Sequence, residues 1–191
     1  MRLFVAVELD GHVRATAAGV TRDLRDRLPG VAARWVDADK MHLTVRFIGH
    51  VVDAQAPAII EALGAPLGIA PFDVELGPCG VFPRSGAPRV LWIGLKRGLD
   101  SLQALHHEFN RRLAPLGFAA EDRPFSAHLT VARIKDAPRG LMRTAHETVA
   151  GTRVPAATCR VEAAIVFQSS LSPKGSTYTR LRTVELRNPI C

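Results

Sequence analysis

The motif His-Leu-Thr-Val occurs twice in this sequence, at residues 42–45 and again 86 positions later at residues 128–131. Both copies lie in short segments rich in β-branched and aromatic residues, which predicts strands. Residues two apart in a strand share a face, so each copy presents its His and Thr on one side and its Leu and Val on the other. The sequence therefore predicts two strands, each with an imidazole and a hydroxyl facing a cleft and an apolar pair facing a core.

Two neutral imidazoles on opposite sides of a phosphate can share its hydrolysis, because one can take a proton from water while the other gives a proton to the leaving oxygen. We therefore interpret His42 and His128 as candidate catalytic residues. Thr44 and Thr130 can donate hydrogen bonds to the phosphate oxygens. Arg46 continues the face of His42 in a regular strand and is a candidate phosphate ligand. A pair of structural histidines inherited by duplication is the alternative interpretation.

Two further residues near the repeat are harder to place. Arg133 lies five residues after His128, so in a regular strand the two side chains face opposite sides. Arg133 therefore reaches the cleft only if the strand bulges or ends before it. A third His-x-Thr match begins at His146, in a stretch of helical composition outside the repeated register, and we expect no catalytic role for it.

The composition favours a globular protein with an anionic partner. The net charge is +7 from 25 basic and 18 acidic residues, which favours nucleic acid or phosphorylated ligands.

No apolar run approaches the roughly 18 residues of a membrane span, and Glu8 interrupts the N-terminus before a signal peptide is complete, so we expect a cytoplasmic protein without a membrane partner. Cys79, Cys159 and Cys191 are odd in number and widely spaced, which favours free thiols. Neither a His-Glu-x-x-His motif nor a Gly-rich phosphate loop is present, so we expect no metal and no cofactor.

The predicted elements also repeat along the chain. The periodicity predicts strands near 3–9, 42–49, 72–82, 89–95, 128–135, 161–168 and 178–187, and helices over 11–28, 53–67 with Asp53 as N-cap, and 99–116. The predicted fold class is α+β: a single domain over residues 1–191, made of two intertwined lobes with repeat units of about 1–86 and 87–191. Two antiparallel sheets should face a central groove, with the helices outside and pseudo-twofold symmetry between the lobes.

These motifs resemble the two-histidine (2H) phosphoesterases, and within them the RNA 2′,3′-cyclic phosphodiesterases, historically called 2′-5′ RNA ligases. The likeness covers nearly the whole chain, in R-L-F-V-A-V-E-L at the N-terminus, H-L-T-V-R-F-I-G, V-F-P-R…P-R-V-L-W-I-G-L, H-L-T-V-A-R and S-x-L-S-P-x-G-S-x-Y from Ser169. The resemblance implies that His42 donates a proton, that His128 accepts one and that the product ends in a 2′-phosphate. It implies that no metal or nucleotide is needed, and it adds Arg133 as a phosphate ligand.

Further residues are candidates for holding the RNA end. Phe82 could stack on a base, and Arg84 or Arg89 could meet upstream phosphates. Tyr178, the only tyrosine, is interpreted as a buried hydroxyl bonded to backbone. The expected partner is RNA ending in a 2′,3′-cyclic phosphate, and the protein is expected to be a monomer.

Two other functions are open at this stage. One is ligation of 2′-5′ RNA ends, formally the reverse of ring opening with a ribose hydroxyl in place of water. The other is a module that binds RNA ends or nucleotides without turnover. The doubled histidine disfavours the binding module, because permanently charged arginine would serve phosphate binding better.

Overall fold

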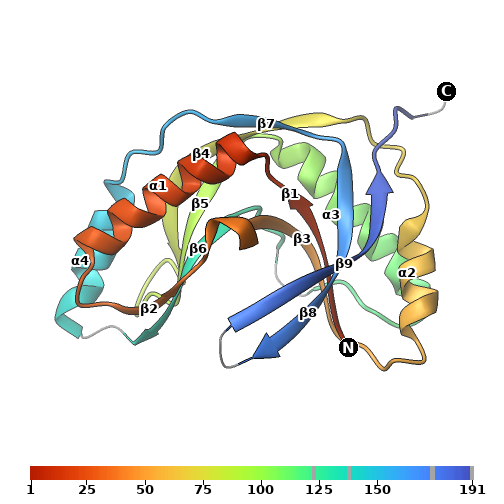
Figure 1. Ribbon diagram of the computed structural model, residues 1–191, viewed down its shortest axis with the longest axis horizontal. Coiled ribbons are helices and arrows are strands. Elements are labelled where there is room, and N and C mark those ends of the chain that lie inside the picture. Colours follow the sequence, from red (N-terminus) through yellow and green to blue (C-terminus); the bar gives the residue numbers. More distant parts are fainter. Residues whose placement is uncertain (122–123, 137–138, 173–174, 190–191) are drawn as a thin grey trace.

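The computed structural model describes residues 1–121, 124–136, 139–172 and 175–189. Its elements follow the chain in the order β1 (Arg2–Glu8), α1 (Gly11–Arg27), β2 (Ala32–Trp35), η1 (Ala38–Lys40), β3 (His42–His50), α2 (Ala56–Gly64), β4 (Phe72–Phe82), β5 (Val90–Arg97), α3 (Leu99–Leu113), η2 (Ala114–Leu116), β6 (Leu129–Asp136), α4 (Arg139–Ala150), β7 (Thr158–Val161), β8 (Ala163–Ser172) and β9 (Gly175–Glu185), where η marks a short 3₁₀ helix. The helices lie outside a strongly curled sheet (Figure 1).

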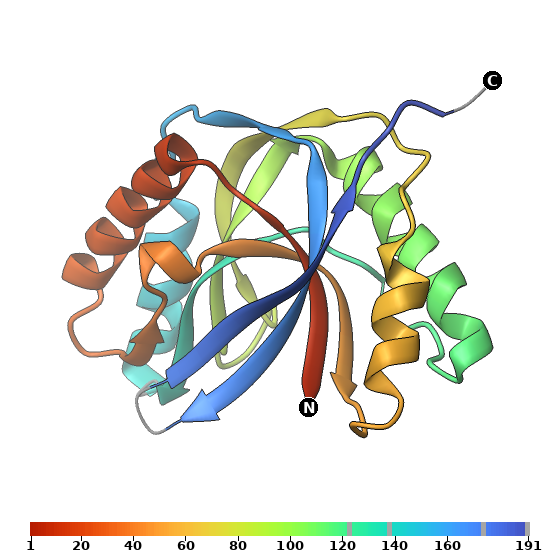
Figure 2. The ribbon, with the colours of Figure 1, turned by 45° about the vertical axis from the view of Figure 1, so that its right-hand side comes forward.

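The described strands all belong to one antiparallel sheet. Its order is β7-β4-β5-β6-β3-β1-β8-β9. Strand β2 pairs with β6 on the side away from β5. The two predicted sheets are the two halves of this sheet, and the described residues join β3 to β6 through one pair, Leu43 with Leu129. Helices α1 and α4 lie outside one half and α2 and α3 outside the other, so the concave face is left open between them (Figures 1 and 2).

Each half of the sheet contains elements from both repeats. We call β1, β3, β8 and β9, with α2 and α3, the His42 lobe. We call β2, β4, β5, β6 and β7, with α1 and α4, the His128 lobe. Strand β4 of the first repeat pairs with β5 in the His128 lobe, whereas β8 of the second repeat pairs with β1 in the His42 lobe. Helices α1 and α3 are exchanged in the same way, since α1 contacts β6 and α3 contacts β3.

The alternation within β1 separates two apolar faces. Leu3, Val5 and Val7 point toward the helices and belong to the main core. Phe4 and Ala6 point the other way, where they form a small cluster of their own with Ile165 and Phe167. Because strand residues alternate between faces, this second cluster lines the concave side of the His42 lobe. The concave face therefore has an apolar floor beside the first motif.

Some predicted boundaries need correction. Helix α2 begins at Ala56 and ends at Gly64, and Asp53 is not its N-cap because its carboxylate pairs with the N-terminal amino group of Met1 at 3.1 Å. The helix predicted over 99–116 ends at Leu113, and a 3₁₀ turn containing Pro115 follows. Proline lacks the N–H that would continue the α-helical hydrogen bonds and clashes with the preceding turn. Strands β2 and β7 were not predicted.

Other predictions are confirmed or lie outside the described residues. The C-terminal hairpin is present, longer than predicted, and residues 173–174 of its loop are outside the described part. Cys79 and Cys159 are free thiols, and residue 191 is not described. Within the described chain, no helix is long and apolar enough to cross a bilayer.

Candidate active site

His42 begins strand β3 directly after the 3₁₀ turn η1, and this position fixes its ring. Its Nδ1 lies 2.8 Å from the carbonyl oxygen of Lys40. A carbonyl oxygen only accepts hydrogen bonds, so Nδ1 carries the proton and donates it. In the neutral ring this leaves the lone pair on Nε2, which is then free to exchange a proton with a substrate.

His128 is held in the same way in the other lobe. Its Nδ1 lies 2.7 Å from the carbonyl oxygen of Ser126, again the residue two positions before the histidine. The acceptors Lys40 and Ser126 are themselves 86 positions apart, so the repeat extends to the backbone groups that orient the rings. Both imidazoles therefore have the same tautomer and the same reactive nitrogen.

Aromatic side chains enclose both rings. Phe4 and Tyr178 lie 5.0 and 5.1 Å from His42 between ring centroids, with Tyr178 edge-on. Phe82 lies 5.1 Å from His128, also edge-on. These rings displace water, and burial accordingly lowers the pKa of both imidazoles. The bonds to the backbone carbonyls oppose this effect only in part.

Charged groups near the histidines break the symmetry between them. The cation of Arg133 lowers the pKa of both His42 and His128, so it lies within electrostatic reach of both rings. Glu8, which is paired with Arg180, raises the pKa of His42. Among the described carboxylates, none has a corresponding effect on the pKa of His128. On balance the pKa of both histidines is lowered, and the two rings differ in that Glu8 partly opposes the effect at His42.

A β-bulge explains how Arg133 reaches the concave face. In the pairing of β5 with β6, Trp92 faces Thr130 but Leu91 faces Ala132, so Val131 is an extra residue. The extra residue reverses the alternation beyond it, and Arg133 lies exposed on the face of His128 and Thr130, whereas Ala132 is buried. The condition set by the sequence pattern, a bulge before Arg133, is met.

The equivalent bulge in β3 makes the prediction for Arg46 wrong. Val5 faces Arg46 and Ala6 faces Thr44, so Val45 is the extra residue and Arg46 turns to the helix side. Its side chain is only 5% exposed. Arg46 therefore does not face the cleft with His42.

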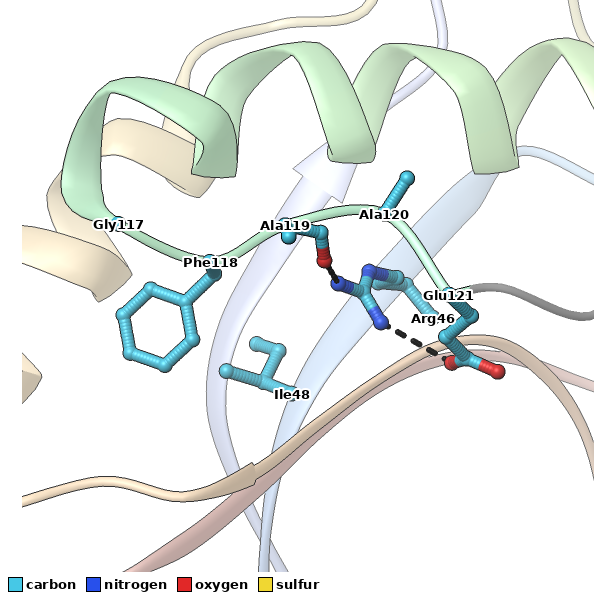
Figure 3. A pocket seen from close by; sticks show the side chains of 7 residues that line it. All are labelled: Arg46, Ile48, Gly117, Phe118, Ala119, Ala120 and Glu121. Atoms are coloured by element: carbon cyan, nitrogen blue, oxygen red, sulfur yellow. Dashed lines mark hydrogen bonds and ion pairs between the residues drawn. The ribbon is translucent and has the colours of Figure 1, made fainter.

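Figure 3 shows where the Arg46 guanidinium goes instead. It donates hydrogen bonds to the carbonyl oxygens of Ala119 and of Phe47, the latter at 2.7 Å, and it pairs with Glu121 at 3.0 Å. These contacts line a surface pocket of about 600 Å³ beside Ile48. Arg46 thus ties strand β3 to the segment that follows α3 and leads toward His128.

The other predicted site residues lie at different distances from the cleft. Thr44 and Thr130 are half-buried and share the faces of their histidines. Phe82 stands beside His128, as described above. Arg89 is exposed immediately before β5. Arg84 is also exposed, but it lines a separate pocket of about 200 Å³ between the end of β4 and helix α4.

His146 lies away from the two motif histidines. It belongs to helix α4 and lines the same pocket as Arg84, and its Nε2 lies 3.1 Å from the carbonyl oxygen of Gly86. Among the described residues, no group of three or more His, Cys, Asp or Glu side chains is arranged to hold a metal ion.

Most of the aromatic enclosure was not predicted from the sequence. Tyr178 is not a buried hydroxyl, because its side chain is 37% exposed and its ring edge meets His42. Phe4, Trp92 and Phe167 were not identified as site residues, although Trp92 and Phe167 lie 6.4 and 6.3 Å from His128 and His42. The signal available in the sequence was the weak repeat that aligns Phe82 with Phe167 at an offset of 85.

Comparisons with known proteins agree with this geometry. Residues 7–92 and 93–178 each match the family described as LigT like phosphoesterase. An Archaeoglobus fulgidus protein named RNA 2′,3′-cyclic phosphodiesterase is 34% identical over 97% of this chain and all of its own length, and a Thermotoga maritima protein of the same name is 30% identical over 93% of this chain and 91% of its own. A Thermus thermophilus crystal structure superposes with a TM-score of 0.79 at 28% identity, covering 98% of this chain and 99% of that one. That of E. coli LigT complexed with 3′-AMP gives 0.73 at 25% identity and covers 97% of both chains. With its two repeats, its curled sheet and its paired histidines, the chain belongs to the LigT-like phosphoesterase family of the 2H superfamily.

Proposed function

We propose that this protein hydrolyses RNA ends that carry a 2′,3′-cyclic phosphate and leaves a 2′-phosphate, with two histidines as the acid and the base and without a metal. The observation that carries the proposal is the matched pair of imidazoles. His42 and His128 each donate Nδ1–H to a carbonyl two residues upstream, which leaves Nε2 as the reactive nitrogen on both. Relatives over nearly the full length are named RNA 2′,3′-cyclic phosphodiesterase, which supports the substrate class.

The reaction needs one base and one acid on opposite sides of phosphorus. Water attacks phosphorus and loses a proton to Nε2 of His128. The bond from phosphorus to the ribose O3′ breaks, and O3′ takes a proton from Nε2 of His42. The product is a 2′-phosphate monoester with a free 3′-hydroxyl, and proton exchange with solvent returns the two rings to their starting states.

The electrostatic asymmetry supports this assignment of roles. The acid must be protonated before reaction, and Glu8 favours the protonated form of His42. The base must be neutral. Burial and the Arg133 cation favour the neutral form of both rings, and Glu8 partly offsets them at His42. The effect of Glu8 has the same sense as the polarity that the family resemblance implies.

Three side chains on the concave face can stabilise the charge on the phosphate oxygens. Arg133 is permanently charged and within electrostatic reach of both rings. Thr44 and Thr130 stand two residues after their histidines on the same face, where their hydroxyls can donate to the non-bridging oxygens. Arg46 is not part of this set, since its guanidinium is bonded on the helix side.

The pocket beside His42 suits the terminal nucleoside. It measures about 290 Å³ and is lined by aromatic and polar groups, among them Phe167, Tyr178 and Asp39. Aromatic rings can stack on a base, and carboxylates can accept hydrogen bonds from base or ribose donors. Phe82 on the side of His128 and Arg89 immediately before β5 are further candidate contacts for the RNA.

The decisive experiment follows an oligonucleotide ending in a 2′,3′-cyclic phosphate in the presence of excess EDTA. We expect ring opening to continue, and ³¹P NMR or chromatography against authentic standards should identify a 2′-monophosphate. A product that is mainly 3′-phosphate would reverse the roles of the two histidines. Activity that is lost in EDTA and returns with one divalent metal would refute the metal-free mechanism.

A further inference from the structure

The concave face of the His42 lobe exposes more apolar surface than the chemistry at His42 requires. Among the described residues, Phe47 and Leu171 are large apolar side chains with 38% and 67% of their surface exposed. Both line one pocket of about 720 Å³. Arg2, His50 and Ser169 line the same pocket.

This pocket adjoins the candidate active site along the strands. Phe47 in β3 pairs directly with Phe4 in β1, and the Phe4 ring is 5.0 Å from that of His42. Directly paired residues of adjacent strands share a face, so Phe47 and His42 flank Phe4 on the concave side. Arg2 lies two residues before Phe4, about 7 Å farther along the strand. The pocket therefore begins one side chain, that of Phe4, beyond His42.

In this pocket the Arg2 guanidinium is stacked over the Phe47 ring. The Arg2 guanidinium carbon lies 4.7 Å from the centroid of the Phe47 ring. Aromatic rings and guanidinium planes are the two surfaces on which proteins stack single-stranded bases. The N–H groups of Arg2 can also bond a phosphate oxygen at the edge of the stack.

The distribution of charge gives the direction in which an RNA strand would leave. The pocket on the other side of His42 is lined by the carboxylates of Glu8 and Asp39 and by the cations of Lys40 and Arg180, so its charges balance. The pocket around Phe47 is lined by Arg2 and His50, and its described lining includes no carboxylate. A chain of phosphates is therefore attracted more strongly by the pocket around Phe47 than by the balanced pocket on the other side. Figure 2 shows the N-terminus and the end of β3 together at the open lower edge of the sheet.

From these contacts we propose that the pocket around Phe47 binds the nucleotide that precedes the cyclic-phosphate end of the RNA, with its base stacked on the pair of Phe47 and Arg2 and its phosphate bonded to Arg2. The inference rests on the proposed function, because it assigns a second subsite for the same substrate. A cyclic mononucleotide has no preceding nucleotide and cannot use this subsite. A trinucleotide with a 2′,3′-cyclic phosphate can.

The test is the ratio of KM for that trinucleotide to KM for 2′,3′-cyclic AMP. Loss of one stacked base costs roughly 5-fold or more in binding, so Phe47→Ala should raise the ratio by about that factor, and Phe47→Trp should keep it near the wild-type value. Arg2→Ala should also raise the ratio and should weaken its dependence on salt. Leu99→Ala is the matched control, because Leu99 is a similarly exposed apolar residue at the start of α3, and it should leave the ratio unchanged.

The outcomes separate this inference from the proposed function. If the wild-type protein opens neither substrate, the proposed function is wrong. If it opens both and Phe47→Ala leaves the ratio at the wild-type value, the subsite is wrong and the function stands. If Arg89→Ala raises the ratio while Phe47→Ala does not, the RNA leaves over the His128 lobe and the inference is overturned.

Discussion

Replacing Arg46 with methionine tests whether this arginine acts by holding the fold or by binding the substrate. Methionine keeps the length of the apolar stem but removes the guanidinium, so the carbonyls of Ala119 and Phe47 lose their donor. Each partly buried acceptor left without a partner costs about 1 to 1.5 kcal/mol. The ion pair with Glu121 adds little, because that carboxylate side chain is 46% exposed and can be solvated. We therefore expect Arg46→Met to lower the free energy of unfolding by about 2 to 3 kcal/mol.

Urea unfolding measures this change, and thermal unfolding should show a Tm lower by roughly 5 to 10 °C for a chain of this size. Glu121→Gln is the matched control and should cost less than about 1 kcal/mol. Arg46→Lys should restore little, because one ammonium group cannot reproduce the fork that reaches both carbonyls and the carboxylate. A variant Arg46→Met of wild-type stability, with kcat/KM reduced 10-fold or more, would refute the structural role and return Arg46 to the substrate.

The remaining predictions concern the histidines and their charged neighbours. His42→Ala and His128→Ala should each reduce kcat by about 10² to 10⁴, as loss of a general acid or base does, whereas His146→Ala should change it little; near-normal turnover in either motif variant would make that histidine structural. Arg133→Gln should raise the pKa of both motif histidines, because the cation that disfavours imidazolium is gone, and NMR titration of the two rings checks the direction. Glu8→Gln should lower the pKa of His42 and leave that of His128 in place, and an equal shift in both would contradict the electrostatic asymmetry.

The sequence was sufficient to find the two histidines and the α+β class. The two repeats share the motif residues and the order of the strands and helices around them. The alternation of a regular strand also places His42 and Thr44 on one face, as observed. The faces of Arg46 and Arg133 were not predictable, because the extra residues Val45 and Val131 reverse the alternation and a bulge depends on pairing with a distant strand.

The aromatic enclosure was missed for a similar reason. Phe167 is 125 positions from His42, and the two meet only because β8 crosses to the lobe of the first repeat. Tyr178 reaches His42 through the same hairpin. Local patterns predict which segments are strands, but the order of strands in the sheet is set by the packing of the whole chain.

The exchange of strands between the repeats means that neither repeat contains a complete half of the active site. His42 belongs to the first repeat and its neighbour Phe167 to the second, whereas His128 belongs to the second and its neighbour Phe82 to the first. A single repeat could surround its own histidine in this way only by associating with an identical copy and swapping strands with it. Such a swapped dimer would have two equivalent sites for proton transfer, and joining the two copies in one chain is what allows Glu8, Phe47 and Arg133 to make them different. In the mechanism proposed above, this difference is what assigns the acid to one histidine and the base to the other.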